Sequence, residues 1–236
     1  MATSNRKKGA ELARMQAGLM RIATLAELDT VVSHAGRASD FEVVEDQPTF
    51  CGNARKKAVE TAAHLRSLGV AASDLVLADD SGLCVDALDG APGVHSARYA
   101  GPHASDRERI DKLLAALERR SDRGARFVCA LCVAMVGDGD PASTTPIFEH
   151  EASVVGDILE EARGSDGFGY DPIFAPAPHE LADAGLASPS DRRSFAELGA
   201  TVKDKIGHRG KALAALARFL SKQTLFSALD RNERQG

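Results

Sequence analysis

The sequence lacks any apolar run long enough to cross a membrane. Its longest strongly apolar run covers residues 127–136, well short of the roughly 18–20 residues that a spanning helix needs. Arg6, Lys7 and Lys8 near the N-terminus are not followed by an apolar stretch, so a signal peptide is not expected. We therefore expect a cytoplasmic protein that makes no use of a membrane.

An excess of positive charge is also absent. The 236 residues include 29 Lys and Arg against 34 Asp and Glu, which gives a net charge of −5. General nucleic-acid binding depends on neutralising phosphates with excess Lys and Arg, so we do not expect it here. One small anion can still bind if basic residues are concentrated at a single site.

The cysteines lack the spacing of a disulfide framework. Cys51, Cys84, Cys129 and Cys132 lie in apolar contexts, and we expect them to be reduced core residues. Cys129 and Cys132 have CxxC spacing, but residues three apart on a strand point to opposite faces. Because no second CxxC occurs, a metal or redox role for this pair is disfavoured.

Helix and strand signals alternate along the chain, which is typical of an α/β protein. Apolar spacing predicts helices over residues 54–68, 106–119 and 208–221, and buried strands at residues 75–78 and 127–136. We expect one domain over residues 1–221, with a surface loop at about 175–194 that is rich in Pro, Ala, Ser and Asp. Residues 222–236 are predicted to form a polar tail.

The N-terminal segment has the composition of a phosphate-binding loop. Thr3 and Ser4 supply donors, and Arg6, Lys7 and Lys8 stand at the start of a predicted helix. Helix N-terminal amides favour an anion, whereas cations at that end oppose the helix dipole unless an anion is bound. A flexible basic tail explains the same residues equally well.

Two acidic residues follow the strand predicted at residues 75–78. Asp79 and Asp80, with Ser81 and Gly82 after them, would lie at a strand end, where α/β proteins place ligands. Two carboxylates can hold Mg²⁺ together with phosphate oxygens and water, or one can orient an attacking water as general base. The alternative is a solvated acidic turn.

Two later segments could recognise a base and phosphates. Phe168 lies among three glycines and could stack on a base, a contact worth about 1–3 kcal/mol. Asp171, held extended by the proline after it, could point its carboxylate at a base edge. Lys203 and Arg209, which flank His208, could donate to phosphate or to a purine carbonyl. The alternatives are a turn before a core strand and a helix cap with basic residues.

Together these segments supply phosphate donors, a carboxylate pair, an aromatic platform and a second basic cluster, which are the components needed to cleave a nucleoside triphosphate. No GxxxxGK[ST] segment occurs, so a P-loop NTPase is excluded. On matching motifs in the same order, the chain closely resembles the inosine/xanthosine triphosphate pyrophosphatases, the HAM1-like family. The matching segments are residues 2–8, 49–58, 78–83, 85–101, 167–174 and 196–210.

The resemblance implies an elongated α/β fold, in which a central mixed sheet is flanked by helices in two lobes with the substrate cleft between them. It also implies a homodimer that uses Mg²⁺ to hydrolyse the noncanonical purine nucleotides ITP, dITP and XTP to NMP and pyrophosphate, cleansing the nucleotide pool. A non-catalytic nucleotide-binding or sensor module on the same fold is the alternative.

Site roles follow from the resemblance, residue by residue. Asp80 matches the proton acceptor and Mg²⁺ ligand, Asp79 is a further metal candidate, and Ser81 matches a substrate contact. The other residues that match substrate contacts are Thr3, Ser4, Asn5, Arg6, Lys7 and Lys8 in the TxNxxK phosphate loop, Phe168, Gly169, Tyr170 and Asp171 in the base-binding segment, and Lys203, His208 and Arg209.

Three features depart from the family pattern. Many members have Glu where this chain has Gly52, and that Glu helps to bind Mg²⁺. We therefore expect Asp80 to be the main protein ligand of the metal, with Glu45 or Asp46 as candidates to replace the missing Glu. Members usually have a short apolar strand before the phosphate loop, which predicts either a start upstream or a sheet without that strand. The 175–194 loop is longer than usual and could alter access or specificity.

Overall fold

A long antiparallel sheet forms the centre of the molecule, which is described here from a computed structural model. Its strands are β1 (Leu75–Val85), β2 (Gly124–Met135), β3 (Phe148–Ile158) and β4 (Phe174–Pro176). They lie in the order β1-β2-β3-β4, and each neighbouring pair is antiparallel. The structure describes residues 23–29, 38–137, 140–141, 144–183, 185–186 and 192–233.

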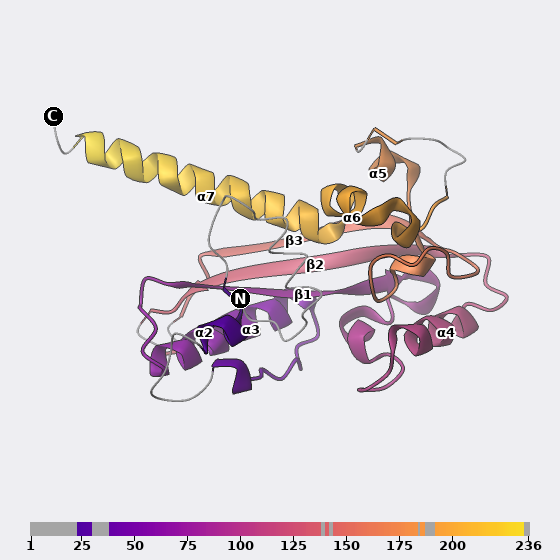
Figure 1. Cartoon of the computed structure of the whole chain (residues 1–236), viewed down its shortest axis with the longest axis horizontal. Helices are drawn as coiled ribbons and strands as arrows, with labels where there is room; N and C mark the ends of the chain where they lie inside the picture. The colour runs from indigo at the N-terminus through magenta and orange to yellow at the C-terminus, as the bar shows by residue number, and fades with distance from the viewer. Residues whose placement is uncertain are drawn as a thin grey trace.

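Helices cover both faces of this elongated sheet (Figure 1). One face carries α2 (Leu25–Leu28) and α3 (Phe50–Ser67), and the other carries α5 (Pro178–Ala182), α6 (Phe195–Ile206) and α7 (His208–Glu233). Helix α4 (Asp106–Ala116) lies at one end of the sheet, where its Ile110 and Leu113 join the same apolar cluster as Phe195 of α6. Short 3₁₀ turns complete the chain, namely η1 (Ala38–Asp40), η2 (Asp86–Leu88), η3 (Gly93–Arg98) and η4 (Asp171–Ile173). The predicted α/β class, with a central sheet flanked by helices, is confirmed, but the described strands pair only antiparallel where a mixed sheet was expected.

Separate apolar clusters fix the helices to the two faces. On the α3 face, small side chains at helical spacing let the helix lie close to β1 and β2; they are Ala54, Ala58 and Ala62. On the other face, Leu213 and Leu216 of α7 pack against Leu131 of β2. A third cluster at the far end of the sheet brings together the tilted rings of Phe127, Phe174 and Phe195, with centroid distances of 4.7 and 5.3 Å between successive rings.

The predicted helices are present with different ends. The first begins at Phe50, where Thr49 accepts the Gly52 N–H at 3.1 Å, rather than at residue 54. The second follows Ser105, which forms a capping box with Glu108. The third runs on to Glu233, so residues 222–233 are helical where a polar tail was predicted.

The surface loop predicted at 175–194 is wrong in its first part. β4 extends to Pro176 and α5 follows at Pro178–Ala182, with Leu181 fully buried in the core. The composition misled because Pro at the first position of a helix favours its start, and one buried Leu is enough to fix so short a helix.

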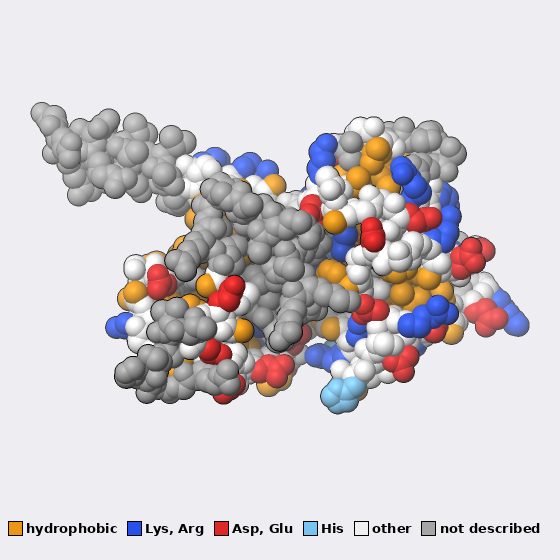
Figure 2. Space-filling model, in the orientation of Figure 1, with side chains coloured by type: hydrophobic (Ala, Val, Ile, Leu, Met, Phe, Trp, Pro, Cys, Tyr) orange, Lys and Arg blue, Asp and Glu red, His pale blue; other side chains and the backbone are white. Residues whose placement is uncertain are grey.

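The described residues include no helix with the length and apolar character needed to span a bilayer. On the face shown in Figure 2, their Lys and Arg side chains lie among Asp and Glu side chains rather than forming one broad basic surface.

Candidate active site

The acidic pair lies inside a strand, not at its end as predicted. β1 continues to Val85, and its pairing with β2 runs unbroken through Asp79, Asp80 and Ser81. Asp and Gly are poor strand residues, which made a turn the natural interpretation, but the long ladder to the buried strand β2 outweighs that preference. Because successive strand residues point to opposite faces, the two carboxylates have different neighbours.

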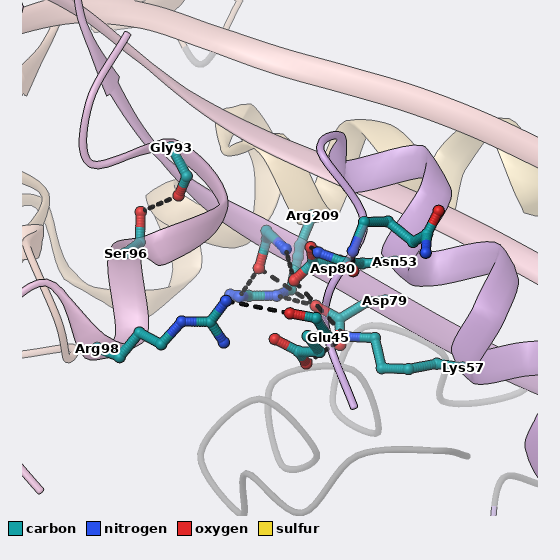
Figure 3. Close-up of polar contacts among 11 residues, drawn as sticks. Glu45, Asn53, Lys57, Asp79, Asp80, Gly93, Ser96, Arg98 and Arg209 are labelled. Atoms are coloured by element: carbon teal, nitrogen blue, oxygen red, sulfur yellow. Dashed lines mark hydrogen bonds and ion pairs between the residues drawn. The ribbon is translucent and has the colours of Figure 1, made fainter. Parts of the chain in front are cut away.

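Asp80 faces helix α3. Asn53 Nδ2 donates to Asp80 Oδ2 at 3.0 Å, and Lys57 Nζ lies 3.5 Å from Asp80 Oδ1 (Figure 3). Asn53 and Lys57 are four residues apart, so they share one side of the helix. The Asp80 side chain is only 6% exposed. A buried carboxylate is thus held by one amide and one cation from the same helix.

Glu45 joins this group through Lys57. Lys57 Nζ donates to Glu45 Oε1 at 2.9 Å, and Arg98 Nη2 donates to the main-chain oxygen of Glu45 at 3.0 Å (Figure 3). Asp46 instead forms an ion pair with Lys56 at 2.8 Å. Of the two acidic residues that could substitute for a metal ligand, Glu45 therefore lies at the site and Asp46 faces away from it.

Gly52 allows the segment around Glu45 to lie against α3. A Cβ at Gly52 would be 2.9 Å from Gln47 Cβ, so a side chain there would push this segment away. With glycine in place, the Gln47 N–H donates to Asn53 Oδ1 at 2.9 Å. Gly52 thus allows the segment that carries Glu45 to approach the helix closely.

The charge of Lys57 is stabilised by its surroundings. Burial alone would lower the pKa of Lys57, but the negative charges of Asp80, Asp79 and Glu45 outweigh burial, and its pKa is raised. Lys57 is therefore a cation at neutral pH, and it places a positive charge beside the carboxylates of Asp80 and Glu45.

Asp79 faces α7. Arg209 Nε lies 3.4 Å from Asp79 Oδ2, and Arg209 Nη2 donates to Ser81 Oγ at 2.7 Å. Ser81 Oγ in turn donates to Asp79 Oδ2 at 3.3 Å. The Arg209 and Asp79 side chains are 4% and 1% exposed, so this is a buried, hydrogen-bonded ion pair.

Arg209 also connects the acidic strand to the aromatic loop. Its Cζ lies 5.5 Å from the centroid of the half-buried Phe168 ring, and Lys203 Nζ lies 4.5 Å from the same centroid. Both are within the range of a cation–π contact. The predicted base platform and the predicted donors are therefore neighbours in space, although Lys203 and Arg209 follow Phe168 by 35 and 41 residues.

Asp171 supports the loop from inside. Its Oδ2 accepts from Lys203 Nζ at 2.7 Å and from the Phe168 N–H at 2.8 Å, and its side chain is 2% exposed. A Cβ at Gly167, where φ is +80°, would collide with this carboxylate. The Asp171 carboxylate is thus turned towards Lys203 and the loop backbone, not outward to a base edge as expected.

Three other predicted contacts are arranged around this loop. Tyr170 is buried and donates its hydroxyl to the Ser96 carbonyl at 3.0 Å, and burial raises the pKa of Tyr170. His208 is buried and stacks on Phe127, with 4.9 Å between centroids and 11° between planes. Gly169 has a positive φ of 63° within the loop. Tyr170 and His208 therefore fix the loop and the start of α7.

The phosphate-loop prediction, Thr3 to Lys8, lies outside the described residues. Sequence reasoning missed Asn53 and Lys57 as members of the site, and it named Glu45 only as one of two substitutes for a metal ligand. A signal for the first two existed, because Asn53, Lys57 and Thr61 recur every four residues among the alanines that α3 buries, and all three are buried. Polar residues on a buried helix stripe need polar partners.

The donor set suits a hard cation that shares its coordination with phosphate. The described residues include no group of three His, Cys, Asp or Glu side chains able to hold a metal together. Asp80 and Glu45 nevertheless present carboxylate oxygens on either side of Lys57. Mg²⁺ commonly takes one or two carboxylates and fills its shell with phosphate oxygens and water, so these residues fit Mg²⁺.

Comparison with known proteins agrees with this geometry. The dITP/XTP pyrophosphatase of Opitutus terrae is 44% identical over 221 residues, which is 93% of this chain and 96% of that protein. Two solved Ham1 protein structures are also similar. That from Coxiella burnetii has a TM-score of 0.71 at 37% identity and covers 94% of this chain and 96% of its own. That from Staphylococcus aureus has a TM-score of 0.70 at 33% identity and covers 94% and 97%. The Ham1 family profile matches residues 1–219, and the chain therefore belongs to the Ham1 family.

Proposed function

We propose that the protein hydrolyses noncanonical purine nucleoside triphosphates, namely ITP, dITP and XTP, to the monophosphate and pyrophosphate. The observation that carries the proposal is the placement of buried Asp80 between Asn53 and Lys57, on a strand that Arg209 connects to Phe168. The names of close relatives, such as the dITP/XTP pyrophosphatase of Opitutus terrae, support this reaction.

The base would bind at Phe168. Its ring offers a stacking surface, and Lys203 and Arg209, which lie over the ring, are donors only. Donors favour a purine with a carbonyl at position 6, whereas an amino group there presents N–H groups to cations. A preference for hypoxanthine and xanthine over adenine follows from that chemistry.

Mg²⁺ would be held by Asp80 and Glu45. When bound, it would neutralise the triphosphate and polarise a phosphate oxygen. Asp79 is less suited to this role because Arg209 and Ser81 contact its Oδ2 on the opposite face of β1. The role that we assign to Asp79 is to hold Arg209 in place through their ion pair.

Proton transfer is assigned to Asp80. Its carboxylate would accept a proton from a water that attacks the α-phosphorus, and pyrophosphate would leave. Lys57 places a cation 3.5 Å from this carboxylate, and Lys57 and Arg209 would stabilise charge that develops on the phosphates. The segment from Thr3 to Lys8 (Thr3, Ser4, Asn5, Arg6, Lys7 and Lys8) is proposed to bind the phosphate chain. We further propose that the protein is a cytoplasmic homodimer.

One assay separates catalysis from mere binding. The protein with Mg²⁺ is given ITP, dITP, XTP, ATP or GTP, and pyrophosphate and orthophosphate are measured separately. We expect pyrophosphate from the first three nucleotides and little from ATP. Binding of ITP without any pyrophosphate would instead favour the sensor module, and orthophosphate alone would indicate a phosphatase.

Asp80→Asn tests the assigned base. Asn keeps the shape and can still contact Asn53 and Lys57, so we expect an unchanged circular dichroism spectrum and loss of turnover. An unchanged rate of pyrophosphate release would remove Asp80 from the base role. Asp46→Asn, at an exposed ion pair with Lys56, is the matched control and should retain activity.

A further inference from the structure

The first turn of α7 contacts three neighbouring strands. Arg209 reaches β1, and His208 stacks on Phe127 of β2 at 4.9 Å between centroids. Lys211 reaches β3, where its Nζ donates to the Ser153 carbonyl at 3.1 Å. Arg209 and Lys211 are two residues apart, so a helix of 3.6 residues per turn directs them about 200° apart around its axis.

Lys211 is held by a buried carboxylate. Its Nζ donates to Glu180 Oε2 at 2.5 Å, and the Glu180 side chain is 7% exposed. The other oxygen, Glu180 Oε1, accepts the Val155 N–H at 3.1 Å. The Ala177 N–H also donates to the Val155 carbonyl at 2.9 Å, which ties the start of α5 to β3. Glu180 therefore connects α7 to a rigid part of the sheet.

We propose that Lys211 and Glu180 are positioning residues that set the rotation of α7 about its axis and so place Arg209 at the site. This inference rests on the proposed function, in which Arg209 contacts the nucleotide. A roll of about 10° moves a side-chain tip at roughly 6 Å radius by about 1 Å. A misplacement of about 1 Å can cost on the order of a hundredfold in rate.

The chemistry of the pair suits orientation more than stability. A buried ion pair contributes little net free energy, because desolvation offsets the attraction. The pair is nevertheless specific in orientation, because Glu180 accepts one hydrogen bond from Lys211 of α7 and another from Val155 of β3. Both hydrogen bonds form only when α7 has one rotation relative to the sheet. Apolar contacts along α7, such as those of Leu213 and Leu216, fix the helix against the sheet but tolerate a small roll.

Lys211→Met removes the charge and keeps most of the length of the side chain. We expect kcat/KM for ITP to fall by about tenfold or more, mostly through KM, with an unchanged circular dichroism spectrum. Lys211→Arg should restore most of the activity, because it can still pair with Glu180. Lys222→Met, at an exposed lysine further along α7, is the matched control. Values within about twofold of wild type for Lys211→Met would overturn the proposal.

A double-mutant cycle distinguishes positioning from general support. If Lys211 acts through Arg209, adding Lys211→Met to Arg209→Lys should cost little further activity. Losses that multiply in the double variant would show an independent structural role and would refute the proposal. If Lys211→Met does not fold, Glu180→Gln replaces it in the cycle, because Gln can still accept from Val155 N–H.

The two proposals fail in different ways. A wild-type protein that releases no pyrophosphate from ITP would contradict the proposed function. The same cycle is then measured on the dissociation constant for inosine monophosphate, by calorimetry. Non-additive losses of affinity would support the positioning role, and additive losses would overturn it.

Discussion

Replacing Lys57 by Met should destabilise the protein in a way that Mg²⁺ partly reverses. Lys57 is 11% exposed and lies between Asp80, at 3.5 Å, and Glu45, at 2.9 Å. Removing one member of a buried ion pair costs about 3–5 kcal/mol. Because Glu45 is one-third exposed, water can replace part of its contact, so we take the lower end, about 3 kcal/mol.

This loss is measured by thermal unfolding in EDTA. For a chain of 236 residues, 1 kcal/mol corresponds to about 2–4 °C in Tm, so Lys57→Met should lower Tm by about 6–12 °C. Adding Mg²⁺ should raise the Tm of the variant more than that of the wild type, because a cation then takes the place of the ammonium group. Lys56→Met, at a neighbouring surface lysine, should change Tm little.

Two results would refute this reasoning. A Lys57→Met protein with the Tm of the wild type in EDTA would show that the ammonium group contributes nothing net to stability. An equal gain from Mg²⁺ in both proteins would show that the metal and Lys57 do not share the same carboxylates, which would also remove Glu45 and Asp80 from the proposed metal site.

Three further changes test the base loop, the cysteines and the glycine of α3. Phe168→Ala should raise KM for ITP by roughly fivefold to 150-fold, which corresponds to the binding free energy of one stacked base, and should change kcat less. An unchanged KM would exclude stacking of the base on Phe168. Burial and the neighbouring Glu151 raise the pKa of the Cys51 thiol to about 11, so labelling by a disulfide reagent should be slow at about pH 7.5 and accelerate as pH rises; rapid labelling at about pH 7.5 would contradict this. Replacing Gly by Ala inside a helix usually raises the free energy of unfolding by about 1 kcal/mol, but Gly52→Ala should not, because its Cβ would lie too close to the Gln47 side chain. A clear rise in Tm for this variant would contradict that close approach.

Local sequence signals predicted most of the elements but not their surroundings. The helix after Ser105 was predicted because its capping box and apolar stripe are contained in the same short segment. The strand end at Asp79 and Asp80 was predicted wrongly because strand length here is decided by pairing with β2, whose residues lie about 50 positions further along the chain.

The site itself depends on contacts that one sequence does not reveal. Residues in recognisable motifs, such as Phe168 and Arg209, were identified, and the structure brings them together. Glu45 could not be placed because its position is fixed by Lys57 and by Arg98, which is 53 residues away. Asp171 was expected to face the ligand because its motif predicts a role but not the direction of the side chain.

The two faces of β1 recruit partners from opposite ends of the chain. Asn53, a partner of Asp80, precedes it by 27 residues, whereas Arg209 follows its partner Asp79 by 130 residues. During synthesis from the N-terminus, Arg209 is made 130 residues after Asp79, so the half of the site on α3 can form before Arg209 is available. A nascent or C-terminally truncated chain would therefore carry a partial site, and nucleotide hydrolysis would begin only after the last long helix has docked.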